Sequence, residues 1–431
     1  MQYDWHQSMA EIDRERWNAL AAASPTPLMT HEWLHHLEES GSITPGNGWT
    51  PSHLTVREGA AMVAAVPLYI RTDSWGEFVF DFAFAEVAGE LGRSYYPKLV
   101  GMSPASPSPA FGFLTTPGRE DELAEPILTA IEQFCRDNEI SVLQFNFVVP
   151  EWQHRLKRLG MTTWEHHGYA WYNENFADFD DYLTRFRKNQ RRNIRRERAS
   201  MDEQGITLGM VAASEAPEHY LHRMAEYYLR TNEQFGPFAA RFLTRDFFTA
   251  MPAEVREHAW FSVAVDTAET NGARHSDHSR HSDHSRHSAR HQDPDGSVAP
   301  NGSLASDGEF DRSADPLALA FLVRKGDRML GRYWGTREER RNLHFNVCYY
   351  TPIEWAISQG IKVFDPGMGS EHKVRRGFRS VPTYSLHRFF DRHMQAILNA
   401  NMDRINSYER AQISMLDESV PYKKRSSDTS R

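Results

Sequence analysis

The sequence predicts an α/β protein built as two copies of one unit, each a mixed sheet flanked by helices. Helix, strand, short helix and strand follow one another along residues 122–172, and the same order returns around residue 351. A strand, a helix and a strand with tight connections form one right-handed crossover of a mixed sheet. A chain of 431 residues is also long for a single core. We therefore expect one domain at residues 1–165 and a second at 166–395.

In the first half, two helices are predicted to lead into a sheet, because apolar residues recur at helical spacing behind polar starts. Residues 74–86 (SWGEFVFDFAFAE) alternate aromatic with small or acidic residues, which predicts a strand. A proline-rich loop follows at residues 103–109. The other elements expected in this half are helices at 11–20, 31–40, 122–138 and 154–159, and strands at 60–70, 140–149 and 169–172.

The second half is predicted to open with a long helix at residues 178–201, whose acidic start and basic end match the helix macrodipole. A hairpin is expected to follow, with residues 260–265 paired to 317–324. The remaining elements expected are helices at 218–235 and 242–251, a strand at 329–334, and a C-terminal helix and disordered tail at 396–431.

Between about residues 267 and 316 the composition changes to Gly, Ser, Asp, Pro and His, with RHSDHS repeated. Such a segment buries too little apolar area to offset its ordering entropy, which predicts a disordered insertion at a loop tip. Its regularly spaced histidines would chelate metal ions only loosely, because no carboxylate or cysteine pattern fixes a geometry. No metal site is predicted, and deleting residues 270–312 is expected to leave folding and activity intact.

The most informative stretch reads LHFNVCYYTPIEWAISQGIKVFDPGMGSEHKVRRGF. Its first residues alternate with a period of two, which predicts a strand with His344 and Cys348 on one face. A helix is expected to begin at Thr351 as N-cap, with Glu354 as capping-box acid, and to end at Gly360. The histidine and cysteine would suit nucleophilic catalysis, although a lone cysteine in a strand is more often a small core residue.

A second strand is predicted at residues 361–365, and a dense polar set follows its carboxyl end. Open α/β sheets bind ligands beyond the carboxyl ends of their strands. We therefore expect this set to belong to a functional site. Its members are Glu371, His372, Lys373, Arg375 and Arg376.

Acetyltransferases of the acyl-CoA type hold pyrophosphate on free backbone N–H groups at the start of the crossover helix. Here Pro352 removes one donor, and the predicted cap would occupy others. The corresponding helix of the first half begins with Glu120, Asp121 and Glu122, which would repel a diphosphate. Neither half shows a loop suited to CoA, and no cofactor is predicted.

Two further clusters carry candidate binding residues. In the run FRKNQRRNIRRERASM, four cations recur at spacings of three and four, which fits either an anion such as a nucleotide diphosphate or tRNA backbone, or a solvated helix face. They are Lys188, Arg191, Arg192 and Arg195.

Glu77 and Asp81 share one face of the predicted strand at residues 74–86. They fit either paired acids of a site or buried members of an ion pair, for which Lys98 could supply the partner. Tyr95 and Tyr96, just before that lysine, could line the same cleft.

The net charge of −9 and the pI near 6.2 exclude binding to nucleic acid by overall charge, so any polyanion site must be local. Two distant cysteines, Cys135 and Cys348, suit a reducing compartment. The first residues lack the basic start and apolar run of a signal peptide, and no run of roughly 18 apolar residues could span a membrane. We expect a cytoplasmic protein without integral membrane contact.

Several long motifs, in this order and spacing, resemble the bacterial FemAB-like predicted N-acyltransferases. The resemblance spans about Trp33 to Phe390. It implies two tandem domains like those of the GNAT acyltransferases, in relatives of enzymes that add amino acids from aminoacyl-tRNA to peptidoglycan precursors. The motifs that carry it are SWGEFVFDFAFAE, YYPKL, RRNIRRER, FLTRDFF, GRYWG, LHFNVCYYTPIEWAI and PGMGSEHKVRRGF.

The expected function is transfer of an acyl or aminoacyl group to an amine, and the resemblance implies aminoacyl-tRNA as the donor and a cell-wall precursor as the acceptor. Aminolysis of an ester needs a base, a stabilised oxyanion and positioned reactants. Glu371 or His372 is the expected base, Lys373 or a strand N–H is expected to face the oxyanion, and Arg332 and Tyr333 to position substrate. The alternatives are an acyl-CoA-dependent N-acyltransferase of the same fold and a non-catalytic protein that binds cell-wall precursors or RNA.

Overall fold

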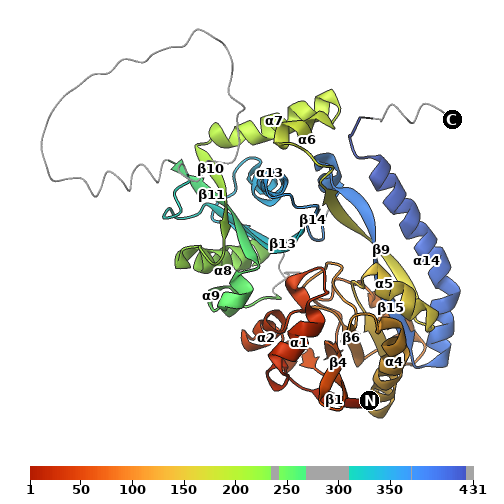
Figure 1. Ribbon diagram of the computed structural model, residues 1–431. Coiled ribbons are helices and arrows are strands. Elements are labelled where there is room, and N and C mark those ends of the chain that lie inside the picture. The colour runs from red at the N-terminus through yellow and green to blue at the C-terminus, as the bar shows by residue number, and fades with distance from the viewer. Residues whose placement is uncertain (234–241, 268–309, 370, 424–431) are drawn as a thin grey trace, which may run out of the picture.

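The computed structural model describes residues 1–233, 242–267, 310–369 and 371–423, and shows strands and helices alternating through both halves (Figure 1). The strands of the first half are β1 (Gln2–His6), β2 (Trp49–Pro51), β3 (His53–Glu58), β4 (Ala61–Val66), β5 (Leu68–Arg71), β6 (Lys98–Gly101), β7 (Leu114–Thr115), β8 (Val142–Phe145) and β9 (Thr162–Tyr172). Its helices are α1 (Arg14–Ala21), α2 (His31–Glu39), α3 (Phe82–Glu90), α4 (Glu120–Asp137) and α5 (Pro150–Arg158), with short turns η1 (Met9–Glu11), η2 (Pro27–Met29) and η3 (Pro45–Asn47).

The second half adds more helices around its strands. These strands are β10 (Ile206–Ala212), β11 (Ala259–Asp266), β12 (Ala318–Lys325), β13 (Arg328–Thr336), β14 (Val363–Asp365) and β15 (Arg379–Phe389). The helices are α6 (Phe179–Thr184), α7 (Lys188–Asp202), α8 (Glu218–Glu233), α9 (Arg245–Thr249), α10 (Ala253–Arg256), α12 (Leu343–Phe345), the π-helical η5 (Asn346–Tyr350), α13 (Thr351–Ser358), the 3₁₀ helix η6 (Glu371–Arg376) and α14 (Arg392–Glu418).

One eleven-stranded sheet joins the two halves, in the order β10-β11-β12-β13-β14-β9-β15-β8-β6-β5-β2. The pairs β6–β8 and β13–β14 are parallel, and the other pairs in this sheet are antiparallel. A separate sheet of four antiparallel strands, β1-β3-β4-β7, belongs to the first half. The predicted α/β class, with mixed sheets flanked by helices, is confirmed.

The two halves exchange their last strands. β9 of the first half pairs with β14 of the second, while β15 of the second half pairs with β8 of the first. β9 and β15 also pair with each other, from Arg379 opposite Ala170 to His387 opposite Thr162. The sheet is therefore continuous across the predicted boundary at residue 165, which lies inside β9, and the domain limits themselves stay predictions.

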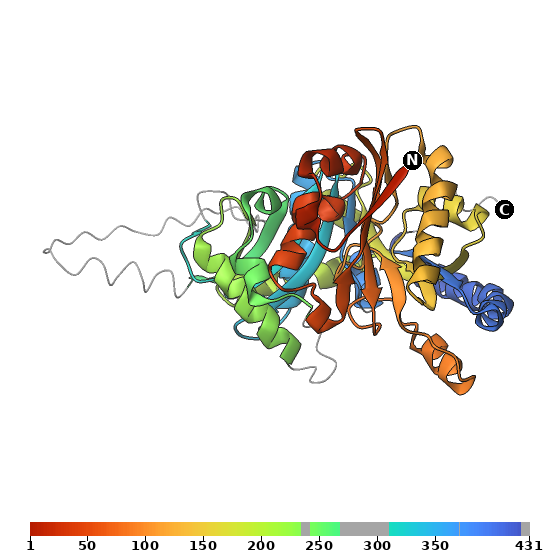
Figure 2. The same cartoon turned by 90° about the horizontal axis from the view of Figure 1, so that it is seen from below.

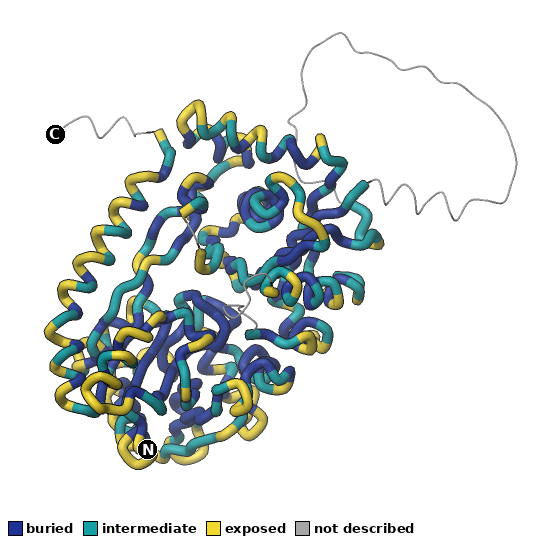
Figure 3. Tube along the Cα trace, turned by 180° about the vertical axis from the view of Figure 1, so that it is seen from behind, coloured by how far each residue is buried: buried dark blue, intermediate teal, exposed yellow. Residues whose placement is uncertain are grey.

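Helices pack on several strands of this sheet. α14 packs along β9 and β15, and α8 packs on β12 and β13 at the opposite side of the molecule (Figures 1 and 2). β6 and β8 are wholly buried, β9 in the middle of the sheet is only partly buried, and the outer side of α14 is exposed (Figure 3). Among the described residues no helix is both long enough and apolar enough to cross a membrane.

Most predicted elements of the first half are confirmed, since helices α1, α2, α4 and α5 lie where the helical spacing places them. α1 begins where Asp13 accepts a hydrogen bond from the Arg16 backbone N–H, at 2.9 Å. The hairpin predicted across the insertion is also found, with β11 antiparallel to β12. Most of the insertion itself lies outside the described residues, as does the end of the C-terminal tail.

The predicted strand at residues 343–349 is wrong, because this stretch is helical. α12, η5 and α13 follow one another from Leu343 without a break. Leu343, Val347 and Tyr350 recur at helical spacing and are buried, so a helix packs the same apolar residues as the expected strand. β13 takes the place of that strand in the crossover to β14, and Gly360 (φ 64°) ends the helix as predicted.

The predicted cap at Thr351 is wrong for the same reason. Tyr350, the residue before it, already has helical dihedral angles, and the helical run starts after Asn342 (φ 63°). Glu354 does not cap the helix but accepts a 2.5 Å hydrogen bond from the buried Arg198 of α7. The expectation that this cap excludes acyl-CoA therefore loses its support.

Three other stretches differ from the prediction. The strand expected at residues 60–70 is divided into β4 and β5, which belong to different sheets. Residues 74–81 are not a strand, and α3 begins at Phe82 because Phe84 and Ala88, one helical turn apart, face the core. The long helix expected at 178–201 is divided into α6 and α7. The Arg187 backbone N–H between them donates to the Pro421 carbonyl, at 2.9 Å, rather than continuing the helix.

Candidate functional site

A cavity of about 350 Å³ lies where the two halves meet. The chain leaving β8 (Phe147, Val148) and the chain leaving β14 both line it, so the carboxyl ends of parallel strands from both halves face the same space. β9, β13, β15 and the proline-rich loop also line it. This junction cavity matches the general position of ligands in open α/β sheets.

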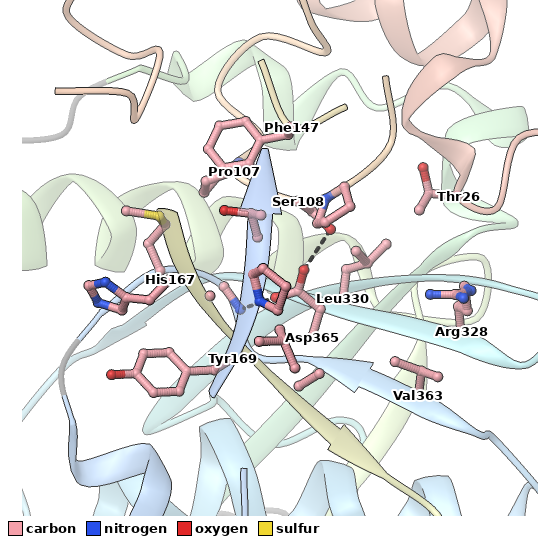
Figure 4. Close-up of a pocket in the computed structure, with 18 of the residues that line it drawn as sticks. Thr26, Pro107, Ser108, Phe147, His167, Tyr169, Arg328, Leu330, Val363 and Asp365 are labelled. Atoms are coloured by element: carbon pink, nitrogen blue, oxygen red, sulfur yellow. Dashed lines mark hydrogen bonds between the residues drawn. The ribbon is translucent and has the colours of Figure 1, made fainter. Parts of the chain in front are cut away.

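Asp365, the last residue of β14, lies in the middle of the cavity wall (Figure 4). Its Oδ2 accepts a 2.6 Å hydrogen bond from the Ser108 hydroxyl, and its Oδ1 accepts one of 2.8 Å from the Gly367 N–H. Burial raises the pKa of Asp365 above its usual value, although both hydrogen bonds oppose the shift. Sequence reasoning missed this residue, although an acid at the carboxyl end of a strand was a usable signal.

Lys373 holds the turn that follows Asp365. Its Nζ donates to the carbonyl oxygens of Gly367 and Met368, each at 2.7 Å, and lies 5.3 Å from the centre of the Tyr169 ring. The side chain is only 2% exposed, and burial lowers the pKa of Lys373 to about 8. Lys373 is thus packed behind the cavity wall formed by the turn and by the tyrosine.

The other two predicted catalytic residues do not line the cavity. Glu371 is exposed. The pKa of Tyr169 is raised mainly by burial of the tyrosine and further by the negative charge of Glu371. The Nε2 of His372 lies 3.0 Å from the Tyr349 hydroxyl. Burial, with the charges of Arg376 and Lys373, lowers the pKa of His372 to about 4, so its imidazole is neutral at pH 7.

His344, Cys348 and Arg376 do gather around η6, although on a helix rather than a strand. The His344 ring lies 5.7 Å from the His372 ring, and burial lowers the pKa of His344 to about 3. Burial raises the pKa of the Cys348 thiol, which disfavours a thiolate nucleophile. Arg376 donates to Glu197 of α7 at 2.9 Å and so attaches η6 to that helix.

Arg332 and Tyr333 of β13 hold the proline-rich loop. Both donate hydrogen bonds to the Ala105 carbonyl oxygen, that of the tyrosine hydroxyl being 2.7 Å long. Burial lowers the pKa of Arg332 below its usual value. These two predicted binding residues therefore anchor a loop of the first half on the second, which places Ser108 against Asp365.

The predicted acidic cluster of the first half comes together as a closed ion network. Lys98 Nζ lies 2.7 Å from Glu77 and 2.6 Å from Asp81, and the Tyr95 hydroxyl donates to Asp81 at 2.6 Å. Burial raises the pKa of Glu77. At Asp81 burial also acts to raise the pKa, but Lys98 and the hydrogen bonds from Ser74 and Tyr95 together lower it. The Tyr96 hydroxyl bonds to Ser74, not to an acid. None of the predicted members lines the cavity.

The predicted basic strip lies on α7, with Lys188, Arg192 and Arg195 exposed and Arg191 half-buried. Lys188, Arg191 and Arg192 form no ion pair with any residue that the structure describes, whereas Arg195 lies 2.9 Å from Asp180. Gln190 on the same helix donates to the Arg375 carbonyl, at 2.8 Å. The strip is therefore attached to η6, and through η6 to the wall of the junction cavity.

No group of three or more His, Cys, Asp or Glu side chains is placed to hold a metal ion within the described ranges. The polar groups at the cavity are instead the Asp365 carboxyl, the His167 imidazole, hydroxyls, the exposed Arg328 and backbone amides. Such groups can accept and donate protons and can bind an anion.

Solved structures with similar folds cover nearly all of this chain. The crystal structure of FemX is 12% identical, with a TM-score of 0.51, over 92% of this chain and 100% of that one. The C-terminal DUF2156 domain of a putative lysylphosphatidylglycerol synthetase from Agrobacterium fabrum is 11% identical, with a TM-score of 0.49, over 91% and 96%. A tandem GNAT protein from the clavulanic acid biosynthesis pathway is 11% identical, with a TM-score of 0.41, over 90% and 98%.

No curated protein matches the sequence. A family model does, over residues 8–274 and 308–424, which is most of the chain, and so confirms the resemblance drawn from the motifs. The chain belongs to the FemAB-like family, described as peptidoglycan biosynthesis/recognition.

Proposed function

We propose that the protein transfers an aminoacyl or acyl group from an activated ester to an amine of a cell-wall component, in the junction cavity. The observation that carries this proposal is Asp365, a carboxyl of raised pKa at the point where the strand ends of both halves meet. A base of raised pKa in a cavity suits removal of a proton from an attacking amine. Membership of a family described by peptidoglycan biosynthesis/recognition supports the substrate class.

In the proposed reaction the amine nitrogen attacks the carbonyl carbon of the ester. A C–N bond forms as the carbonyl π pair moves onto oxygen, and Asp365 accepts the proton that the amine loses. When that pair returns, the C–O bond to the leaving alkoxide breaks, and the alkoxide takes the proton from Asp365. The Ser108 hydroxyl, bonded to Oδ2 at 2.6 Å, keeps the carboxylate oriented during both transfers.

The size of the cavity supports a donor whose bulk lies outside it. About 350 Å³ is at the lower end of the range of ligand pockets, so the cavity suits the reacting ends of two substrates. The basic strip on α7 lies on the element that is joined to η6 by Gln190 and Arg376. We therefore propose aminoacyl-tRNA as the donor, with its phosphates on the strip and its ester end in the cavity.

The test is turnover of a mixture of aminoacyl-tRNAs with a UDP-linked muramyl pentapeptide, followed by mass spectrometry of the acceptor. We expect an acceptor heavier by one aminoacyl residue with the native protein. Asp365→Asn should lower kcat by about 10²- to 10⁴-fold, the usual contribution of a general base.

Asp403→Asn, the same chemical change at an exposed position of α14, should leave kcat unchanged. Equal loss in both variants would show that the cavity carboxyl has no special part. Transfer from acyl-CoA alone, with no use of any aminoacyl-tRNA, would contradict the proposed donor.

A further inference from the structure

The turn between Asp365 and η6 presents two backbone N–H groups in a fixed direction. The carbonyls of Gly367 and Met368 both point at Lys373 Nζ, at 2.7 Å each. A trans peptide unit is planar, so the N–H of the next residue points opposite to each carbonyl. The N–H groups of Met368 and Gly369 therefore both point away from Lys373. Met368 and Gly369 line the cavity, and Lys373 does not.

These two N–H groups are not used within the fold. Neither donates to an acceptor among the described residues, whereas the N–H of Gly367 is bound by Asp365 at 2.8 Å. The backbone of the turn depends on glycine, with φ of 75° at Gly367 and 141° at Gly369. A Cβ at Gly369 would also lie 3.1 Å from Lys373 Nζ. Successive N–H groups in such a turn form a concave binding place for an anion.

We infer that the N–H groups of Met368 and Gly369 form the oxyanion hole of the transfer reaction, and that Lys373 is the positioning residue that aims them. The inference rests on the proposed function. As the amine nitrogen bonds to the ester carbon, the carbonyl π pair becomes a lone pair on oxygen. The two N–H groups donate to that oxygen until the pair returns and expels the alkoxide.

The position of Lys373 strengthens this arrangement electrically. Its ammonium group lies directly behind the two peptide units, in a site only 2% exposed, so its charge is weakly screened. Its field and the two peptide dipoles act on the same negative oxygen. The base Asp365 is on the same turn, so one short segment would carry both the proton acceptor and the oxyanion donors.

The experiment compares kcat and KM of the native protein with two changes at the turn. Lys373→Met removes the ammonium but keeps most of the side-chain volume. An ester bond in place of the amide at Met368, introduced as the α-hydroxy acid, removes one N–H and keeps every side chain.

We expect kcat to fall about 10²- to 10³-fold in each, with KM nearly unchanged, because the oxygen is charged only in the transition state. Lys362→Met is the matched control, since Lys362 is exposed and its side chain bonds only to Asn175 among the described residues. Its kcat should equal that of the native protein.

A binding readout separates this inference from the proposed function. The probe is the monomethyl ester of 1-aminoethylphosphonate, a tetrahedral anion, titrated into protein labelled with [¹⁵N]methionine. The Met368 amide signal, assigned through Met368→Leu, should shift in the native protein and in Lys362→Met, but not in Lys373→Met.

If the native protein transfers no group from any donor and this signal still shifts, the proposed function fails and the anion site stands. If the native protein is active, and the ester variant keeps full kcat or the signal does not move, the oxyanion hole is refuted.

Discussion

At the residue scale, burial shifts the pKa values of two ionisable groups of the site in opposite directions. It raises the pKa of the acid Asp365 and lowers the pKa of the base Lys373 to about 8. In both cases the charged form loses its hydration and is disfavoured. Both pKa values are thereby brought closer to neutral pH, where a carboxyl of raised pKa transfers protons efficiently.

Titration of Lys373 should make kcat depend on pH, and the ratio of kcat between the native protein and Lys373→Met isolates this effect. Its positive charge is present below a pKa of about 8 and is lost above it. We expect kcat of the native protein divided by kcat of Lys373→Met to be large at pH 7 and to fall as pH rises through about 8. The ratio cancels the pH dependence of the incoming amine, and a ratio constant from pH 6 to 10 would contradict a role for the charge.

The stability effect of the same group has a defined sign. The unfolded chain keeps this proton up to about the usual lysine pKa of 10.5, whereas the folded chain loses it near 8. Between these values the unfolded state binds more protons, so the contribution of Lys373 to stability rises with pH. Lys373→Met should remove that rise from urea unfolding curves, while Lys362→Met should keep it.

At the scale of elements, the sequence predicted the type of most helices and misassigned segments whose patterns fit two structures. Residues 343–350 alternate like a strand, yet Leu343, Val347 and Tyr350 also recur at helical spacing, and short apolar runs fit both periods. The contacts that hold this helical segment come from α7, which is distant in sequence, for example the Asn346 side chain donating to the Glu197 carbonyl at 2.9 Å. Local pattern could not contain that information.

The candidate site was predictable only in part, because local pattern does not contain contacts between segments that are distant in sequence. Lys373 was found because polar residues beyond a strand end stand out in sequence. Ser108 was not, because it meets Asp365 only through the loop that Arg332 and Tyr333 hold across the junction. The acids Glu77 and Asp81 were expected on a strand, but they lie in a loop and both pair with Lys98. This arrangement favours the interpretation as buried ion-pair members over that as binding residues.

At the scale of elements, we predict that the basic strip on α7 binds the phosphates of aminoacyl-tRNA. Lys188→Ala combined with Arg192→Ala should weaken binding of aminoacyl-tRNA and lower the slope of log K against log salt by about 1 to 2, because each phosphate contact releases counterions. Fluorescence anisotropy at several salt concentrations measures this. Arg392→Ala with Arg404→Ala, two exposed arginines of α14, is the matched control, and an equal effect there would mean that binding follows overall charge.

At the scale of the whole molecule, the exchanged strands make the two halves interdependent. A fragment of residues 1–178 keeps β8 and β9 but loses their shared neighbour β15. We expect this fragment to show no cooperative unfolding in urea and to associate through its open strand edges, because unpaired edges are templates for pairing. A chain ending at residue 423 should unfold cooperatively, and a monomeric 1–178 fragment with a sharp transition would contradict the expectation.

The exchange also has a consequence for synthesis on the ribosome. β8 is complete at Phe145, but its partner begins at Arg379. At usual elongation rates about 230 residues separate them by roughly 10 to 50 s, during which a nascent chain holds half a sheet without its closing strand. We therefore expect the first half to complete its sheet only after β15, which ends at Phe389, has been synthesised.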